Sequence, residues 1–552
     1  MQDLIPRAKR IAASCPKVSV ERLALLTSVY FTVFCNNAFW SFYASLADLA
    51  TAKAWLTGLS LGIGITGMHM VLLCLVLGRW NAKFVLTAIF AVTAFAVYYM
   101  NQYTVFIDAD MVRNVLHTEP KEAMELVTPG LAWAVLFYAV IPAAVVWRLE
   151  LRRRPLGRAI AIRIGALLVV VAVSVIAILA SFQDISAMMR NNKSMRYLIT
   201  PGNVAASLGR VGQDAMAGAD KPRIRVGEDA VERQNPGGKP KLLVIIVGET
   251  VRAANWGLSG YLTNTTPELQ ALDVVNFEDV TACGTSTEVA LPCMFSARGR
   301  RNYDKDIINR SESLLHVLNY AGIRTLWRDN QTGCKGVCTD LPFQSYLNAK
   351  DSPACIGSRC FDEVLLDRLE AEVDASETSQ VIVLHQLGNH GPSYFSRYPQ
   401  KFKRFTPACE TAQLGDCTPE EIVNAYDNAI LYTDHVIAKT IEFLEEQDDR
   451  DTALIYVSDH GESLGEGGLY LHGIPYAIAP DVQLKVPMVL WLSSSIKESQ
   501  GISMACLRRR ARAPASHDNL FSSVLGLMQV TTGTYDQDWD LFFQCARPRT
   551  DG

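Results

Sequence analysis

Residues 241–250, KLLVIIVGET, and residues 453–462, ALIYVSDHGE, decide the fold of the second half of the chain. Each begins with a short apolar run rich in β-branched residues, and residues 380–391, QVIVLHQLGNHG, follow the same pattern. Such runs are typical of buried strands. Helical patterns over Ser311–Ala321 and Pro419–Gln447 alternate with them. This order predicts a largely parallel sheet with helices on both faces.

Polar residues follow each of these three strands directly. Glu249 follows the first, His385 and His390 follow the second, and Asp459 and His460 follow the third. Ligands bind beyond the carboxyl ends of the strands in such sheets, and carboxylate and imidazole groups suit zinc. A lone Asp-His pair is usually a loop feature, but three ligand-rich strand ends in one sheet predict a zinc site.

The composition separates this half from the first third of the chain. The 552 residues have 20% charged residues and a mean hydropathy of +0.12, which is high for a soluble protein of this size. A net charge of −4 and a pI near 6.2 argue against a nucleic-acid partner. Each of five apolar stretches approaches the length of about 20 residues that crosses a bilayer. They are Leu23–Ala47, Ala54–Leu77, Lys83–Met100, Gly130–Val146 and Arg158–Ala180.

Positive charges set the expected orientation of these spans. Lys and Arg gather in residues 7–22, 79–83 and 148–158, so the positive-inside rule places these three segments in the cytoplasm. We therefore expect a five-span membrane domain over residues 1–182, with an external loop at 101–129. An interfacial helix and linker over 183–240 and an external α/β domain over 241–552 follow it. Five buried helices of a soluble protein are the alternative.

The external loop carries a second group of candidate residues. Asp108–Leu126 reads as an amphipathic helix pair broken near Pro120. Asn114, Thr118 and Glu122 recur every four residues, so a continuous helix places them on one face. A solvated helical face is the alternative interpretation of this spacing.

Ten of the thirteen cysteines lie between Cys283 and Cys545, on the side that the charges place outside the cytoplasm. Disulfides persist in such oxidising compartments, and a zinc-thiolate site is the alternative. The ten residues form close pairs and one remaining pair, although the sequence leaves their connectivity open. These pairs are Cys283/Cys293, Cys334/Cys338, Cys355/Cys360, Cys409/Cys417 and Cys506/Cys545.

The segment between the first two of these cysteines, Gly284–Pro292, reads GTSTEVALP. Small hydroxyl residues before an apolar run are typical of a helix start. A hydroxyl there faces free backbone N–H groups and the positive end of a helix dipole, which suits a phosphate. Plain helix capping is the alternative.

Taken together, these segments resemble a known family, the phosphoethanolamine transferases of Gram-negative inner membranes. The resemblance is greatest to the lipid A-modifying type that includes the mobile colistin-resistance enzymes. It implies five transmembrane helices followed by a periplasmic α/β domain similar to the alkaline phosphatase and sulfatase superfamily. Its motifs are VGET (247–250), CGTSTEVALPCMFS (283–296), WRDNQTGCKGVC (327–338), LHQLGNHGPSYFSRYP (384–399), YDNAILYTD (426–434), SDHGESLGE (458–466) and YLHGIPY (470–476).

The resemblance also implies roles for individual residues. The zinc ligands are Glu249, Thr287, Asp459 and His460, and Thr287 is also the nucleophile that becomes modified. Lys335, His390 and His472 hold the phosphoethanolamine group, and a second zinc ion near the two histidines is left open. Asn114, Thr118 and Glu122 contact the lipid donor. His385 follows its strand directly, so we expect it among the substrate-binding residues as an orienting group, and a structural histidine is the alternative. Glu288 departs from the family pattern of small or aromatic residues after the threonine.

The function implied is transfer of phosphoethanolamine from phosphatidylethanolamine to a lipid A phosphate, which reduces outer-membrane negative charge and gives resistance to cationic peptides such as polymyxin. We expect a monomer in the inner membrane with its catalytic domain in the periplasm. Three alternatives remain. They are transfer to a core sugar, periplasmic glucan or protein, a membrane-anchored phosphodiesterase, and a non-catalytic receptor with a degenerate enzyme domain.

Overall fold

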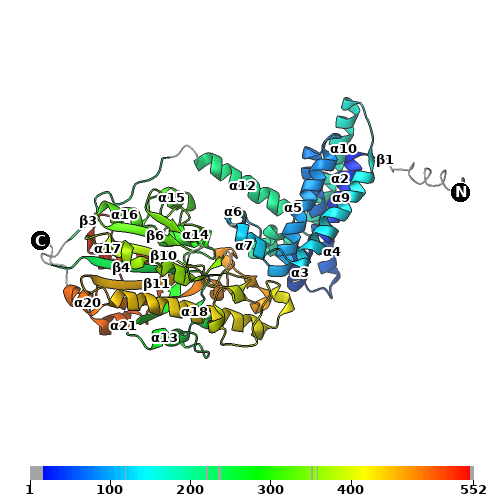
Figure 1. The fold of residues 1–552 in the computed structure, drawn as a ribbon. Helices are drawn as coiled ribbons and strands as arrows, with labels where there is room; N and C mark the ends of the chain where they lie inside the picture. Colours follow the sequence, from blue (N-terminus) through cyan, green and yellow to red (C-terminus); the bar gives the residue numbers. More distant parts are fainter. Residues whose placement is uncertain are drawn as a thin grey trace, which may run out of the picture. The chain divides into compact units, whose positions relative to one another are not determined.

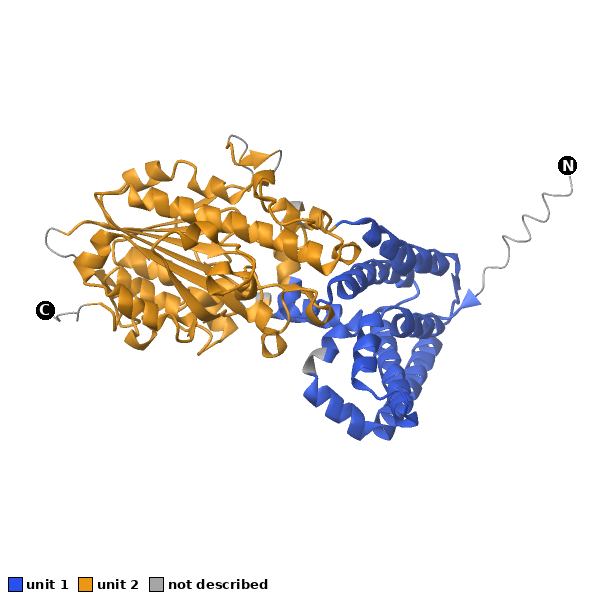
Figure 2. Cartoon of the chain, turned by 90° about the horizontal axis from the view of Figure 1, so that it is seen from below, with its two compact units in different colours: residues 1–112, 127–213 blue, residues 113–126, 214–552 orange. Residues whose placement is uncertain are grey.

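The computed structural model describes residues 17–118, 120–218, 222–233, 238–347, 349, 352–356 and 359–546. The chain forms two compact units (Figure 2). The helical unit comprises residues 1–112 and 127–213, and the α/β unit comprises residues 113–126 and 214–552. Residues of the external loop thus cluster with the α/β unit. The boundaries at 182 and 240 are predicted from changes in composition, whereas the two units are defined by contacts within each unit. These boundaries therefore stay a prediction.

In the described part of the helical unit, four helical segments are long and apolar enough to cross a membrane. They are α4 (Ala52–Val76), α5 (Ala82–Tyr103), the continuous α8–η1–α9 segment (Pro129–Arg148) and α10 (Leu156–Ala180). The predicted first span corresponds to a bent pair, α2 (Val20–Phe34) and α3 (Asn37–Leu46), with 53° between its axes. Its two helices are long and apolar enough together, and they make a fifth candidate if the pair forms one broken span. At the bend, the Asn36 amide donates to Phe31 O and Thr200 O, so its side chain satisfies carbonyls there.

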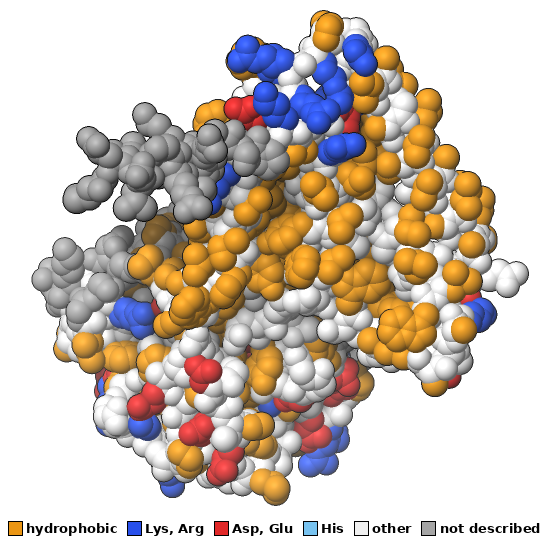
Figure 3. All heavy atoms as spheres, turned by 90° about the vertical axis from the view of Figure 1, so that its right-hand side faces the viewer, with side chains coloured by type: hydrophobic (Ala, Val, Ile, Leu, Met, Phe, Trp, Pro, Cys, Tyr) orange, Lys and Arg blue, Asp and Glu red, His pale blue; other side chains and the backbone are white. Residues whose placement is uncertain are grey.

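Apolar side chains face outward over much of this unit (Figure 3). The α10 helix has no buried residue, and its best window has a mean hydropathy of 2.8. An isolated apolar helix face of this size is costly in water but matches a hydrocarbon environment. The exposed apolar side chains of the helical unit therefore indicate that this unit lies in a membrane.

The external loop and the linker contain short elements. The predicted break near Pro120 is confirmed, because α6 (Ala109–His117) ends before it and α7 (Pro120–Glu125) begins at it. After α11 (Phe182–Asn191) and η2 (Lys193–Leu198), α12 (Gly202–Gly218) extends into the predicted linker. Further on, β3 (Val231–Glu232) pairs with β16 (Val530–Thr531), so part of that linker is attached to the α/β unit.

An eight-stranded sheet forms the centre of the α/β unit (Figure 1). Its order is β15-β5-β14-β11-β4-β10-β6-β7. The five strands from β11 to β7 are parallel, as predicted, whereas β14 runs antiparallel to both β11 and β5. The sheet is therefore mixed. The bounds are β4 Lys241–Gly248, β5 Val275–Thr281, β6 Arg324–Asp329, β7 Phe343–Ser345, β10 Gln380–His385, β11 Asp451–Ser458, β14 Lys485–Leu492 and β15 Ala515–Ser516.

The two faces of the sheet are covered by separate apolar cores. Leu243, Ile245 and Val247 of β4 pack on the side of α16 (Leu314–Tyr320) and α22 (Asp518–Leu527). The alternate residues, at 242, 244 and 246, pack on the side of α18 (Pro419–Glu445). The two-residue period of a strand sends successive side chains to opposite faces, so every residue of β4 is buried.

All five cysteine pairs of the α/β unit are disulfides, which confirms the interpretation of their spacing. They join Cys283 to Cys293, Cys334 to Cys338, Cys355 to Cys360, Cys409 to Cys417 and Cys506 to Cys545. In the described part of the helical unit, Cys35 and Cys74 are free and buried. Among the cysteines that the structure describes, the oxidised ones thus lie only in the unit that the charge pattern places outside the cytoplasm.

Candidate metal centre and nucleophile

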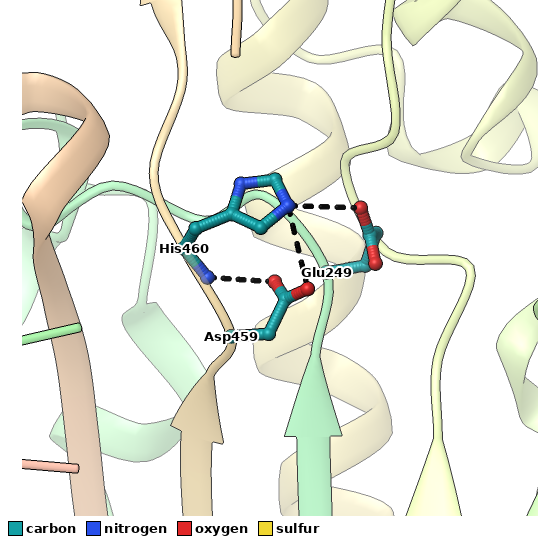
Figure 4. A group of neighbouring side chains, drawn as sticks. All are labelled: Glu249, Asp459 and His460. Carbon is teal, nitrogen blue, oxygen red and sulfur yellow. Dashed lines mark hydrogen bonds and ion pairs between the residues drawn. The ribbon is translucent and has the colours of Figure 1, made fainter. Parts of the chain in front are cut away.

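Glu249, Asp459 and His460 converge at the carboxyl ends of β4 and β11 (Figure 4). The register pairs Ser458 with Gly248, so the residues that follow the two strands lie at one level. His460 Nε2 is 3.6 Å from Glu249 Oε1 and 3.4 Å from Asp459 Oδ2, and all three side chains are fully buried. One ligand atom from each lies within 4.8 Å of the others. The structure therefore brings together three of the four predicted zinc ligands.

The hydrogen bonds around this group orient its ligand atoms inward. Asp459 Oδ1 accepts bonds from Thr250 N (3.1 Å) and His460 N (2.7 Å). Asp459 Oδ2, which is buried, has no hydrogen-bond partner among the described residues. His460 Nδ1 donates to Gly461 O at 3.0 Å, and burial lowers the pKa of this imidazole to about 3. A neutral ring with its proton on Nδ1 presents a lone pair at Nε2.

Two carboxylate oxygens and an imidazole lone pair thus face one another in a buried space. Such an arrangement is repulsive for the protein alone, and a cation between the three atoms removes the repulsion. Mixed oxygen and nitrogen donors of this kind suit zinc. The side chains present therefore fit a divalent metal, with Asp459 Oδ2 as an oriented ligand atom.

Thr287 supplies the hydroxyl beside this group. It is the first residue of α14 (Thr287–Met294), and its side chain is buried. Its Oγ1 donates to Glu249 Oε2 at 3.0 Å and lies 3.4 Å from His460 Nε2. The fourth predicted ligand thus lies beside the other three, at the positive end of a helix dipole, and its role as a metal ligand stays a prediction. The helix start predicted between Cys283 and Cys293 is confirmed.

Gln331 is a site residue that the sequence analysis missed. Its Nε2 donates to Glu249 Oε2 at 3.0 Å, and its side chain is buried. It follows β6, a strand whose buried polar residues hide its pattern. The amide fixes the carboxylate oxygen that also accepts from Thr287.

The rings of His390 and His472 lie next to the Glu249–Asp459–His460 group. The ring centroids of His460 and His472 are 4.4 Å apart, and those of His472 and His390 are 5.7 Å apart. His472 Nδ1 lies 3.1 Å from Glu462 Oε2, and Glu462 Oε1 accepts from the Tyr394 hydroxyl. The hydrogen bond to Glu462 therefore orients the ring of His472.

His385 lies apart from these ligands in its hydrogen bonding. Its Nδ1 pairs with Asp329 Oδ1 at 2.7 Å, and both residues are fully buried. Burial alone raises the pKa of Asp329, but the hydrogen bond and charge of His385 outweigh it and lower that pKa below its usual value. The pair links the ends of β10 and β6, which matches a supporting position better than substrate contact.

Lys335 and Thr118 line one cavity of about 580 Å³ with Glu288 and Thr332. The lysine has a left-handed backbone, with φ of 47°, between the bonded Cys334 and Cys338. Its Nζ donates to Thr332 Oγ1 (2.7 Å) and Thr332 O (3.1 Å). The described residues include no bond from Lys335 to Thr287. Its predicted phosphate contact stays a prediction.

The other external-loop candidates are only partly placed. Thr118 Oγ1 donates to Asn114 O at 2.8 Å, which closes the end of α6. Glu122 belongs to α7, but its side chain lies outside the described residues. The helix break means that these three positions do not share one continuous helical face.

The sequence analysis also missed Glu125, which anchors the loop. Its buried carboxylate accepts from Arg397 Nη2 at 2.7 Å and from Nη1 at 3.4 Å, and Arg359 Nη2 lies 2.8 Å away. Arg397 Nε donates to His390 O at 2.6 Å. A buried, two-bond ion pair therefore connects α7 to the backbone of a site histidine.

A buried hydroxyl beside two carboxylates and an imidazole, at the ends of parallel strands, defines a metal-binding α/β domain of the sulfatase class. The family model described as Sulfatase matches residues 241–530, and the model described as phosphoethanolamine transferase EptA/EptB matches residues 65–216.

Known proteins match nearly the whole chain. It is 36% identical over 531 residues to the phosphoethanolamine transferase EptA of Salmonella typhimurium, covering 95% of this chain and 96% of that protein. It is 33% identical over 528 residues to the phosphatidylethanolamine transferase Mcr-1 of Escherichia coli, covering 93% and 96%. The solved integral membrane protein lipooligosaccharide phosphoethanolamine transferase A (EptA) from Neisseria meningitidis aligns with a TM-score of 0.93 at 34% identity, covering 97% and 100%.

The chain belongs to the phosphoethanolamine transferase EptA family. It is a phosphoethanolamine transferase with a multi-span membrane unit and a periplasmic catalytic unit, as the family resemblance implied. The spans, the five disulfides and the buried Glu249–Asp459–His460 group agree with this assignment.

Proposed function

We propose that this enzyme moves phosphoethanolamine from phosphatidylethanolamine to a lipid A phosphate through a covalent Thr287 intermediate. The observation that carries the proposal is the position of Thr287 Oγ1, 3.0 Å from Glu249 Oε2 and 3.4 Å from His460 Nε2. The names of the relatives, a lipooligosaccharide phosphoethanolamine transferase and a phosphatidylethanolamine transferase, support a lipid acceptor and this donor.

We propose Glu249, Thr287, Asp459 and His460 as ligands of one zinc ion. Zinc held there supplies Lewis-acid chemistry, because it favours the ionised form of a ligating hydroxyl and offsets phosphoryl charge. Asp459 Oδ2 and the Nε2 lone pair of His460 already point at the shared space. Gln331 keeps the Glu249 carboxylate in place by its hydrogen bond to Oε2.

The transfer has two steps. In the first, Thr287 Oγ1 forms a bond to phosphorus while the bond from phosphorus to the glycerol oxygen breaks. The hydroxyl proton of Thr287 already lies on the bond to Glu249, and a neighbouring histidine, His390 or His472, protonates the departing diacylglycerol oxygen. In the second step, an oxygen of the acceptor phosphate attacks the same phosphorus, and the bond from phosphorus to Thr287 Oγ1 breaks. Thr287 then regains the proton held by Glu249, and the histidine takes a proton from the acceptor phosphate or from water.

The remaining predicted residues take supporting roles in this proposal. Lys335 offsets the phosphoryl charge from the side of the cavity that it lines. Asn114, Thr118 and Glu122 contact the lipid donor from the external loop, which clusters with the α/β unit over residues 113–126. His385 positions Asp329 and, through it, the loop that carries Gln331.

Mass spectrometry of lipid A from Gram-negative cells tests this proposal. Cells expressing the wild type gain lipid A carrying one phosphoethanolamine, and cells expressing Thr287→Ala do not. Thr378→Ala is the matched control, because this exposed threonine precedes β10 at the opposite end of the strands. Unmodified lipid A beside well-expressed wild type removes lipid A as the acceptor and directs the search to core sugars, glucans and proteins.

A further inference from the structure

The cavity of about 580 Å³ contains side chains of opposite charge. Glu288 and Pro292 line it from α14, Thr332 and Lys335 from the loop after β6, and Thr118 from the external loop. All of these residues belong to the α/β unit. The cavity therefore offers one fixed anion and one fixed cation to whatever enters it.

Glu288 is the anion, and it is next to the nucleophile in sequence and space. It follows Thr287 in the first turn of α14, so their Cα atoms are about 3.8 Å apart. Its side chain is only 10% exposed, and its Oε2 lies 3.0 Å from His117 Nδ1. Its second oxygen, Oε1, has no hydrogen-bond partner within the described ranges of the chain. A mostly buried carboxylate, on the residue that follows the nucleophile in α14, thus keeps one oxygen available in this cavity.

Lys335 is the cation, and its position is built rather than incidental. The Cys334–Cys338 disulfide and the left-handed backbone at residue 335 fix the loop that carries it. Two bonds to Thr332 fix the ammonium group. Lysine and glutamate are thus held separately on two walls of one cavity, with no ion pair between them in the described structure.

A phosphoethanolamine group has the complementary charges. Its phosphate is anionic, and its ammonium follows after a short O–CH2–CH2 link. In the proposed transfer the phosphorus becomes bonded to Thr287 Oγ1, and Glu288 is the next residue of α14. We infer that Glu288 binds the ammonium of the donor headgroup and makes the enzyme selective for a cationic amine. This inference rests on the proposed function, and it adds the residue that binds the ammonium end of the transferred phosphoethanolamine.

The same carboxylate disfavours other headgroups. A neutral or anionic terminus leaves Glu288 without a partner for its available oxygen, and a buried charge without compensation is costly. An acid in the first turn of α14 also complements the helix dipole. A purely structural role of that kind affects every donor equally, which separates it from recognition.

The test compares two donors in the first step alone. The purified full-length enzyme receives phosphatidylethanolamine or its N-acetyl derivative, whose amide carries no charge, without acceptor. Diacylglycerol release is measured by mass spectrometry for the wild type, Glu288→Gln and Glu278→Gln. The last is the control, because it makes the same charge change at an exposed position of β5.

We expect the wild type and Glu278→Gln to prefer the amine donor, and Glu288→Gln to lose about 10- to 100-fold in kcat/KM on that donor alone. Its activity on the N-acetyl donor stays at the wild-type value. An unchanged preference in Glu288→Gln, or equal losses on both donors, overturns the inference while leaving the proposed transfer intact. A wild type that releases diacylglycerol from neither donor overturns the proposed function and the inference together.

Discussion

Replacing Asp459 by asparagine tests whether the Glu249–Asp459–His460 group is built around a cation. Asparagine has nearly the same shape, so its oxygen accepts the two backbone bonds that Oδ1 accepts from Thr250 and His460. Its NH2 group then lies where Oδ2 was, 3.4 Å from His460 Nε2. The substitution exchanges a ligand atom for a donor directed at that lone pair.

The expected magnitude follows from the geometry. The ligand atoms lie within 4.8 Å of one another. At an effective dielectric constant of about 20, two carboxylate charges at that separation repel by about 3 kcal/mol. Without metal, Asp459→Asn therefore raises the free energy of unfolding by up to about 3 kcal/mol. With zinc at a thousand times its dissociation constant, the wild type gains about 4 kcal/mol and the variant gains little.

Asp459→Asn should therefore be more stable than the wild type without metal and less stable than the wild type with zinc. Unfolding midpoints of the detergent-solubilised full chain, measured with a chelator and with zinc, report that order, and elemental analysis reports bound zinc. Asp427→Asn removes a buried carboxylate outside the group and should show no reversal. A variant less stable than the wild type in chelator, or one that zinc stabilises as strongly, refutes the reasoning.

Three further predictions concern the α/β unit. Removing the Cys506–Cys545 disulfide, whose cysteines are 39 residues apart, should lower the free energy of unfolding by about 4 kcal/mol by chain entropy. The same removal at Cys334–Cys338, with a separation of 4, should cost about 2 kcal/mol, and denaturant titrations compare the two. Burial raises the pKa of Asp427 to about 6, so the folded state holds a proton that the unfolded chain releases above about pH 4. Stability should therefore fall as pH rises from about 4 to 6, by at most about 1.4 kcal/mol per unit, and Asp427→Asn should abolish this slope in unfolding midpoints. Arg397→Lys keeps the charge opposite Glu125 but loses the two-bond geometry and the bond to His390 O, so kcat should fall about tenfold with little change in KM, and steady-state transfer kinetics measure the split.

The strands that carry the metal group were predictable because their sequences are locally unambiguous. The β4 and β11 strands are fully buried, each contains a central run of apolar residues, and the ligands follow directly after each strand. Parallel pairing of such runs places Glu249 and Asp459 at one level, whatever the remaining strands do. The antiparallel strand β14 was not predicted, because its apolar run carries no sign of its direction or partners.

The residues that the sequence analysis missed depend on contacts between distant segments. Gln331 follows β6, where Arg328 and Asp329 are buried charges that obscure the apolar pattern of a central strand. Glu125 lies 272 residues from its partner Arg397, and one acid in a short amphipathic helix reads as a solvated residue. The local sequence pattern predicts which face of a helix or strand is buried. It does not predict which charged residue from a distant segment forms an ion pair there.

His517 shows how this long-range support reaches the nucleophile. Its Nδ1 accepts from Cys283 N at 3.1 Å, and its Nε2 donates to Ser458 O at 2.9 Å. Burial lowers the pKa of this imidazole to about 4, so it stays neutral with its proton on Nε2, as both bonds require. One ring therefore ties the disulfide-closed segment that carries Thr287 to the strand end that carries Asp459. His517 thus connects the segment of the nucleophile with the strand end that carries two ligands, so the geometry of the site also depends on hydrogen bonds along the carboxyl edge of the sheet.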